Sequence, residues 1–139
     1  MSKKSPSLSF RLKLVLIWSY VYFIASILLS IAYRSIPDSE LNTDPNTDRI
    51  LTIFTNLIVS ALAGLTIYLL HKRKEKAVVA FIMMTLVSYG LSSIAGIAVS
   101  SQAYTISEIT IVSIFFLVDL YLVAYLLLSA EVKSQLKQK

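Results

Sequence analysis

The chain of 139 residues contains no cysteine and a single histidine, His71. The absence of thiols excludes disulfides, thiolate zinc sites, iron–sulfur clusters and cysteine nucleophiles. One histidine cannot ligate a haem from both sides, and no group of acids beside it forms a metal site. The G-x-S-x-G, P-loop and H-E-x-x-H motifs are also missing. We therefore predict a chain that carries no enzymatic chemistry of its own and holds no cofactor and no metal.

Charged residues are scarce, at 15% of the chain, whereas an average soluble domain carries about a quarter. Hydrophobic residues make up 56%, and only three glycines and three prolines are present. This composition excludes loop-rich and low-complexity chains. The length fits one domain that covers residues 1–139.

Four long apolar runs occupy most of the sequence, at residues 14–33, 50–70, 77–99 and 109–128. None contains Lys, Arg or His, and each reaches the roughly 20 helical residues that cross a bilayer. Barrel strands are half as long and alternate polar with apolar residues, which these runs do not. The sequence therefore predicts an all-α integral membrane protein, a four-helix bundle that runs up-down-up-down.

Turn residues between the runs place the helices at approximately 12–35, 49–71, 76–100 and 107–131. Pro37 stops the first helix, because proline disfavours helix at the residue before it. Residues 36–48 form an acidic loop, and residues 71–76 form a tight basic hairpin.

Lysine and arginine are shared unevenly between the two ends of these helices. The N-terminal tail, the 71–76 hairpin and the C-terminal tail hold eleven of the thirteen, and only Arg34 and Arg49 flank the acidic loop. By the positive-inside rule, both termini and the hairpin face the cytoplasm. We predict a multi-pass protein of the cell (plasma) membrane, with the acidic loop outside.

The cations of the hairpin also predict a partner. At the inner face they attract the anionic headgroups of the bilayer, and the residues concerned are Lys72, Arg73, Lys74 and Lys76. Nucleic-acid binding is not predicted, because the membrane topology already accounts for these charges.

Small and hydroxyl residues recur at four-residue spacing, which puts them on one face of each helix. Such faces usually mark helix–helix contacts in membranes. The third run carries Ser88, Ser92 and Gly96, the second carries Asn56, Ser60 and Gly64, and the first carries Ser26 and Ser30. Tight packing within the bundle is one interpretation, and a polar route through it is the other. Trp18, Tyr20 and Tyr68 are expected at the inner membrane boundary, as interfacial aromatics.

Asp119 is the one acid inside an apolar run. It lies ten residues into the last run, about 15 Å deep at 1.5 Å per residue. Glu108 precedes it by eleven residues, three helical turns, on the same face. No cation of this chain lies at that depth, so the expected hydrogen-bond partners are Ser88, Tyr89 and Ser92, with Ser26 as a further one.

An acid at this depth usually faces the interior of a bundle and marks function. Asp119 can serve as a neutral packing group, pair with a group on another subunit, or couple a proton or cation to transport. The leading hypothesis is a non-catalytic structural or accessory subunit of a larger membrane complex, such as a respiratory, oxidase or secretion assembly. The alternative is a small homo-oligomeric proton- or cation-coupled transporter that uses Asp119, with Glu108 at its outer mouth.

Overall fold

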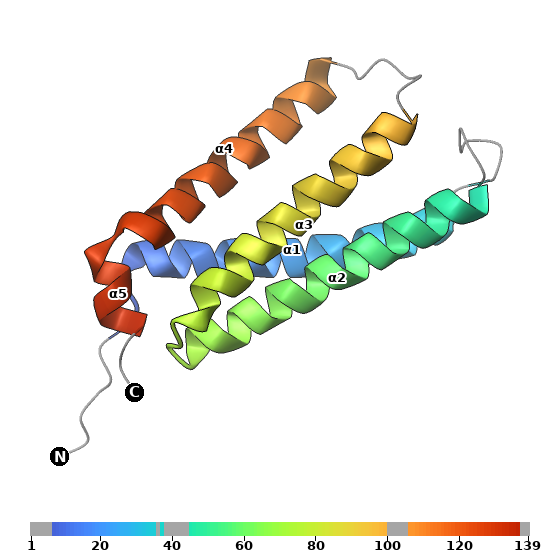
Figure 1. Ribbon diagram of the computed structural model, residues 1–139. Helices are drawn as coiled ribbons and strands as arrows, with labels where there is room; N and C mark the ends of the chain where they lie inside the picture. The colour runs from blue at the N-terminus through green and yellow to red at the C-terminus, as the bar shows by residue number, and fades with distance from the viewer. Residues whose placement is uncertain (1–6, 36, 38–44, 100–105, 137–139) are drawn as a thin grey trace.

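The computed structural model describes residues 7–35, 37, 45–99 and 106–136, without the side chains of residues 45, 48, 91–99 and 108. Within that part of the chain every regular element is a helix (Figure 1). The helices are α1 (Phe10–Arg34), α2 (Pro45–His71), α3 (Lys76–Val99), α4 (Ile106–Leu128) and α5 (Ala130–Leu136). The all-helical prediction is therefore confirmed.

Local chemistry accounts for the helix ends. Ser9 caps α1 by accepting a hydrogen bond from the backbone N–H of Leu12, at 3.3 Å. Between α2 and α3, Arg73 takes a left-handed φ of 51°, and the N–H of Lys74 donates to the carbonyl of Leu69 at 2.9 Å.

Two expected boundaries are wrong. Helix α2 begins at Pro45, about four residues before the expected start at 49, because proline is tolerated in the first turn, where its missing N–H has no partner to lose. The last helix does not run to 131. It ends at Leu128, and the separate helix α5 follows.

Three helical stretches are long and apolar enough to cross a membrane: Phe10–Arg34, Arg49–His71 and Ile109–Leu128. The membrane class predicted from the sequence is confirmed at this level. Helix α3 is 24 residues long, but the part of it with described side chains, Lys76–Gly90, is shorter than a span.

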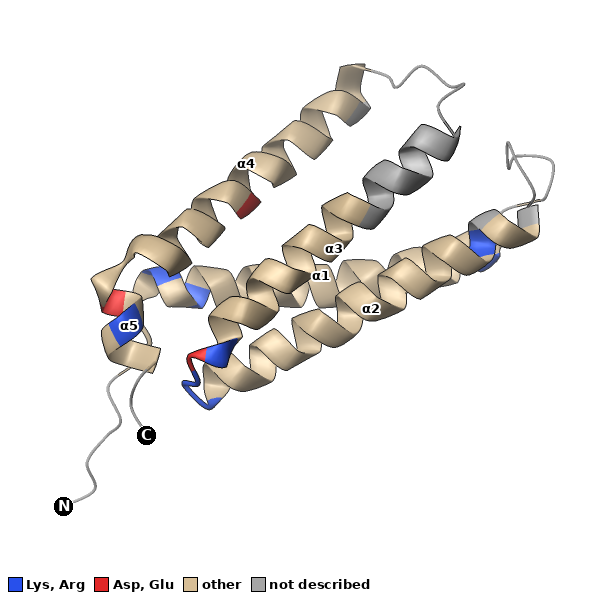
Figure 2. Cartoon of the chain, viewed as in Figure 1, with Lys and Arg blue, Asp and Glu red and all other residues tan. Residues whose placement is uncertain are grey.

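Most of the described basic residues lie at one end of the molecule, here called the basic end, whereas Arg34 and Arg49 lie at the other. The start of α1, the turn between α2 and α3, and α5 lie there together (Figure 2). This end carries Arg11, Lys13, the cations of residues 72–76, and Lys133. The three segments that the sequence assigned to one face of the membrane are therefore adjacent in space.

The apolar core lies at the same basic end. Buried side chains from all five helices meet there: Leu12, Val15, Leu70, Ala77, Phe81, Met84, Leu122, Leu126, Val132 and Leu136. Helix α5 is also held to the start of α1 by polar contacts, because the N–H of Ser9 donates to Oε1 of Gln135 at 3.0 Å. The Tyr125 hydroxyl donates to Glu131 at 3.1 Å and lies 3.3 Å from the Ser9 hydroxyl.

Away from the basic end, α4 has few neighbours. From Ile106 to Leu117, every residue of α4 whose side chain is described is exposed, on all sides of the helix. Burial begins only at Val118 and Asp119. Helix α4 is therefore buried against the rest of the chain mainly in its second half, which starts near the acid.

Candidate functional site

The carboxyl group of Asp119 is the centre of the site and is only 2% exposed. Trp18 Nε1 donates to Oδ1 at 2.7 Å, and the hydroxyl of Tyr22 donates to Oδ2 at 2.5 Å. The hydroxyl of Tyr89 donates to the same Oδ2 at 2.6 Å. One acid on α4 thus joins α1, through two donors, to α3, through one.

Helix geometry explains why two donors come from α1. Trp18 and Tyr22 are four residues apart, so their side chains leave the helix on the same face, one turn from each other. The indole reaches one oxygen of the carboxyl and the phenol reaches the other. Their rings pack edge to face, with centroids 6.3 Å apart.

Two aromatic residues of α4 complete the surroundings of the acid. Phe115 and Phe116 precede Asp119 by four and three residues, on the same side of α4. The Phe115 ring lies 5.1 Å from that of Trp18, and the Phe116 ring lies 5.5 Å from that of Tyr89. The carboxyl is therefore enclosed by rings and hydrogen-bonded by neutral groups.

The donor set restricts where a proton can reside. An indole N–H can only donate, so Oδ1 must act as an acceptor toward Trp18 in either charge state. A tyrosine hydroxyl can both donate and accept. A proton on this carboxyl is therefore carried by Oδ2, where Tyr22 or Tyr89 can turn its hydroxyl to accept it. The same three partners can therefore satisfy the hydrogen-bonding needs of this carboxyl in either form.

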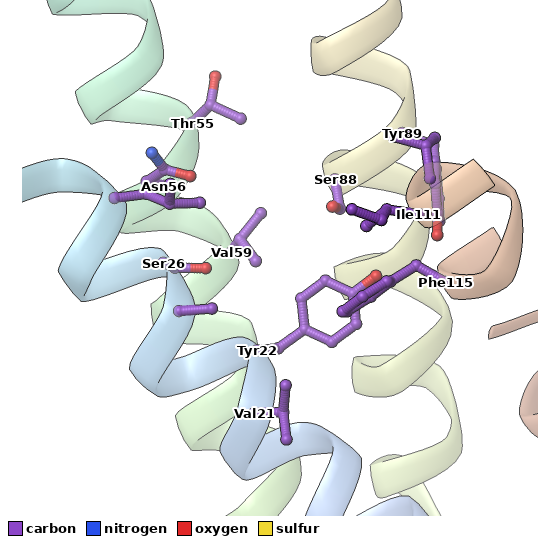
Figure 3. Close-up of a pocket in the computed structure, with 13 residues that line it drawn as sticks. Val21, Tyr22, Ser26, Thr55, Asn56, Val59, Ser88, Tyr89, Ile111 and Phe115 are labelled. Carbon is purple, nitrogen blue, oxygen red and sulfur yellow. The ribbon is translucent and has the colours of Figure 1, made fainter. Parts of the chain in front are cut away.

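A cavity of about 370 Å³ lies next to this site, on the side away from the basic end. Four of the helices contribute to it, and the oxygens of Ser26, Asn56 and Ser88 point into the space between them (Figure 3). Tyr22 and Tyr89 line it as well, so the two phenols separate the cavity from the acid. Its complete lining is Val21, Tyr22, Ala25, Ser26, Leu29, Thr55, Asn56, Val59, Ser88, Tyr89, Ile111, Val112 and Phe115.

A second cavity, of about 300 Å³, lies between α3 and α4. Its polar lining consists of Asp119, Tyr89 and Thr85. The other lining residues are Gly90 and apolar side chains of α3 and α4. Tyr89 therefore borders both cavities while its hydroxyl binds the acid between them.

The structure brings together part of the residue set selected from the sequence. Tyr89 binds Asp119 as expected, whereas Ser88, Asn56 and Ser26 line the neighbouring cavity. The side chains of Ser92, Gly96 and Glu108 lie outside the described residues.

Trp18 and Tyr22 were missed as partners of the acid. Trp18 was expected to act as an interfacial aromatic, and the hydrogen bond from its indole N–H to the buried Asp119 was not foreseen. Tyr20 and Tyr68 are exposed, as lipid-facing residues are. The available signal was the spacing of Trp18 and Tyr22, two polar-tipped aromatics one helical turn apart in the run that faces the acid.

The small-residue stripes account for the packing only in part. Gly64 does lie against α1, since a Cβ there would be 3.4 Å from the Phe23 ring. The hydroxyls of Ser60 and Ser30, however, donate to carbonyls of their own helices, those of Leu57 and Ser26. The buried face of α2 is offset by one residue from the expected stripe and consists of Thr55, Val59, Ala63, Thr66 and Leu70.

The predicted lipid-binding cations lie at the basic end. Lys72, Lys74 and Lys76 are exposed in the turn before α3 or at its first residue, and Arg73 between them is half-buried. Among the described residues, no group of three His, Asp or Glu side chains is arranged to hold a metal ion.

The chain matches no protein-family model, no curated protein and no solved structure.

Proposed function

We propose that this protein is a small membrane transporter that couples the movement of a proton or another cation to Asp119. The observation that carries the proposal is the position of Oδ2, which is bound by the two phenols that line the neighbouring cavity. Intramembrane acids of this kind mark ion pathways and proton relays. The proposal departs from the leading sequence hypothesis because Asp119 has three partners within its own chain. Asp119 therefore needs no cation from another subunit to satisfy its oxygens.

The proposed setting is a single-domain bundle that crosses the cell membrane four times. In this arrangement α3 crosses the membrane in addition to α1, α2 and α4, and both termini lie in the cytoplasm. The eleven-to-two distribution of Lys and Arg supports this orientation. The basic end then meets the anionic headgroups of the inner leaflet. The exposed half of α4 is available to a second copy, so the transporter is proposed to work as a homo-oligomer.

Proton flux into liposomes tests the coupling role. The purified chain is reconstituted with a trapped pH-sensitive dye, and a potassium diffusion potential drives protons inward. We expect Asp119→Asn to abolish the protein-dependent flux, because an amide cannot exchange the proton. The fold should survive, since the Asn amide oxygen can still accept from Trp18.

The matched control is Glu75→Gln, the same chemical change at an exposed acid in the turn between α2 and α3. It should leave the flux unchanged. Equal flux in wild-type and Asp119→Asn liposomes would refute the coupling role.

The second candidate function is the accessory subunit of a larger membrane complex. The exposed residues of α4 from Ile106 to Leu117 favour it, because helices of partner subunits can pack against the exposed sides of that half. The native mass of the particle, extracted in mild detergent from its own membranes, separates the two candidates. Other polypeptides in the particle support the accessory role, whereas a small homo-oligomer supports the transporter.

A further inference from the structure

Six polar side chains line the cavity beside Asp119, and the hydrogens of several of their hydroxyls are already committed to hydrogen bonds. The hydroxyl of Thr55 donates its hydrogen to the carbonyl of Leu51, at 2.8 Å. The hydroxyls of Tyr22 and Tyr89 donate theirs to Oδ2 of Asp119. A hydroxyl whose hydrogen is committed keeps its lone pairs. The hydroxyls of Tyr22 and Tyr89 therefore offer acceptors to an occupant, whereas the oxygen of Thr55 points away from these two residues (Figure 3).

Two further features give the cavity a preference for positive charge. None of its lining residues is Lys, Arg or His, and the carboxyl of Asp119 lies directly behind two of the hydroxyls. A hydrogen bond to a carboxylate polarises a hydroxyl, so its oxygen becomes a better acceptor for a next donor. Tyr22, Tyr89 and Phe115 add aromatic rings, whose faces attract cations.

The remaining walls are apolar. They consist of Val21, Ala25, Leu29, Val59, Ile111 and Val112. The volume of about 370 Å³ falls in the range of about 300–1,000 Å³ that small-molecule sites occupy. The cavity thus combines an acceptor-rich end beside the acid with a hydrocarbon wall.

We propose that this cavity binds a primary organic ammonium ion. Its three N–H donors meet the hydroxyl oxygens of Tyr22 and Tyr89 and the carbonyl oxygen of Asn56, while its organic part lies on the apolar wall. The identification of this ammonium ion as the transported cation rests on the proposed function. The binding itself does not depend on transport.

Equilibrium dialysis of radiolabelled benzylammonium against the full-length protein tests the proposal. The protein is held in nanodiscs of phosphatidylcholine, which has no primary ammonium group. We expect saturable binding that benzyltrimethylammonium and benzyl alcohol displace at least about tenfold more weakly than unlabelled benzylammonium. The first competitor keeps the charge without N–H donors, and the second has no charge. If either displaces the label as well as benzylammonium does, or if no saturable binding occurs, the proposal is overturned.

Variants locate the binding. Asn56→Leu keeps the side-chain size but removes the amide, and we expect about tenfold weaker binding of benzylammonium. The matched control is Ser60→Ala, which removes a hydroxyl one turn away on α2, outside the cavity. It should bind as the wild type does. Equal binding by Asn56→Leu and Ser60→Ala places the ammonium elsewhere and overturns the proposal.

A third arm separates two sources of the same headgroup chemistry. Nanodiscs that contain phosphatidylethanolamine present a primary ammonium from the lipid itself. Loss of benzylammonium binding there identifies the lipid headgroup as the natural source, whereas unchanged binding identifies a free amine. Both results leave the site in place.

The proton-flux experiment is read separately. Flux that depends on Asp119 without ammonium binding upholds the transporter and removes this substrate class. Ammonium binding without any flux upholds the site and removes the transporter.

Discussion

At the residue scale, Asp119 is tolerated because neutral groups replace the water it has lost. A buried polar atom without a partner costs about 1–3 kcal/mol, and a charged one costs more. Trp18, Tyr22 and Tyr89 supply three donors to two oxygens. Since the donors come from two helices and the acid from a third, satisfying the acid also fixes how α4 meets α1 and α3.

Removing one donor tests this role. Tyr22→Phe deletes the hydroxyl that binds Oδ2 and keeps the ring. We expect it to lower the free energy of unfolding by about 1–2 kcal/mol, the range for one lost hydrogen bond. The loss is limited because Tyr89 still binds the same oxygen. Circular dichroism during a titration with sodium dodecyl sulfate in mixed micelles measures it.

Tyr20→Phe is the matched control, because it makes the same change two residues earlier on α1, where the side chain is 42% exposed. Its unfolding should match that of the wild type. The double variant Tyr22→Phe, Tyr89→Phe should lose more than the sum of the single losses, since Oδ2 then keeps no donor. Strict additivity would show that the two hydroxyls do not share the acid.

The sequence identified Asp119 and Tyr89 but not the two partners on α1. An acid in an apolar run is visible without any structure, and Tyr89 lies at a matching depth. Trp18 was judged from its place near the start of its apolar run. The helix begins earlier, at Phe10, so Trp18 is about 12 Å along it at 1.5 Å per residue. The distance of Trp18 from the end of its helix depends on where the helix begins, and the apolar run alone does not define the first residue of the helix.

At the element scale, α2 shows that residue type alone does not determine which face of a helix packs against its neighbours. Thr55, Val59, Ala63, Thr66 and Leu70 are buried, whereas the stripe of Asn56, Ser60 and Gly64 was expected to be the packing face. Both stripes contain small or hydroxyl residues, because serine, threonine, alanine and glycine all occur along this helix. A small side chain permits close approach, but the neighbouring helices decide which face is used.

Overpacking distinguishes the two faces of α2. Ala63 is 0% exposed, so Ala63→Leu adds three carbons to a filled space. We expect a loss of about 1–3 kcal/mol in the free energy of unfolding, the usual cost of overpacking. The same mixed-micelle titration measures it.

Ala61→Leu is the matched change, two residues away at an exposed position of α2. It should leave the unfolding free energy within about 0.5 kcal/mol of wild type, as surface substitutions usually do. Equal losses in the two variants would mean that α2 packs on a different face.

At the scale of the whole molecule, the two ends differ in construction. The basic end is filled by apolar side chains from five helices and is closed by α5. The other end holds the cavity, and half of α4 there is exposed on all sides. The acid and its three donors lie where the packed part meets the cavity. An occupant of the cavity therefore touches a polar layer that joins α4 to both α1 and α3.

The number of membrane crossings is the whole-molecule property on which the proposed function depends. Helix α3 is 24 residues long, about 36 Å at 1.5 Å per residue, and a hydrocarbon core of about 30 Å needs roughly 20 residues. Four crossings put the turn before α3 and the start of α4 on opposite sides of the membrane. Three crossings put them on the same side.

Cysteine labelling decides this, and the chain has no cysteine of its own to remove. Single variants Ser35→Cys, Lys74→Cys, Ser107→Cys and Ser134→Cys each place one thiol at an exposed position. In intact cells we expect a membrane-impermeant maleimide to label Ser35→Cys and Ser107→Cys only. Lys74→Cys and Ser134→Cys should react after the membrane is opened, which serves as the control for thiol reactivity. Labelling of Ser107→Cys and Lys74→Cys from the same side would mean that α3 does not cross. A cavity lined by α1, α2, α3 and α4 could then not lie within the membrane, and the transporter proposal would fail with it.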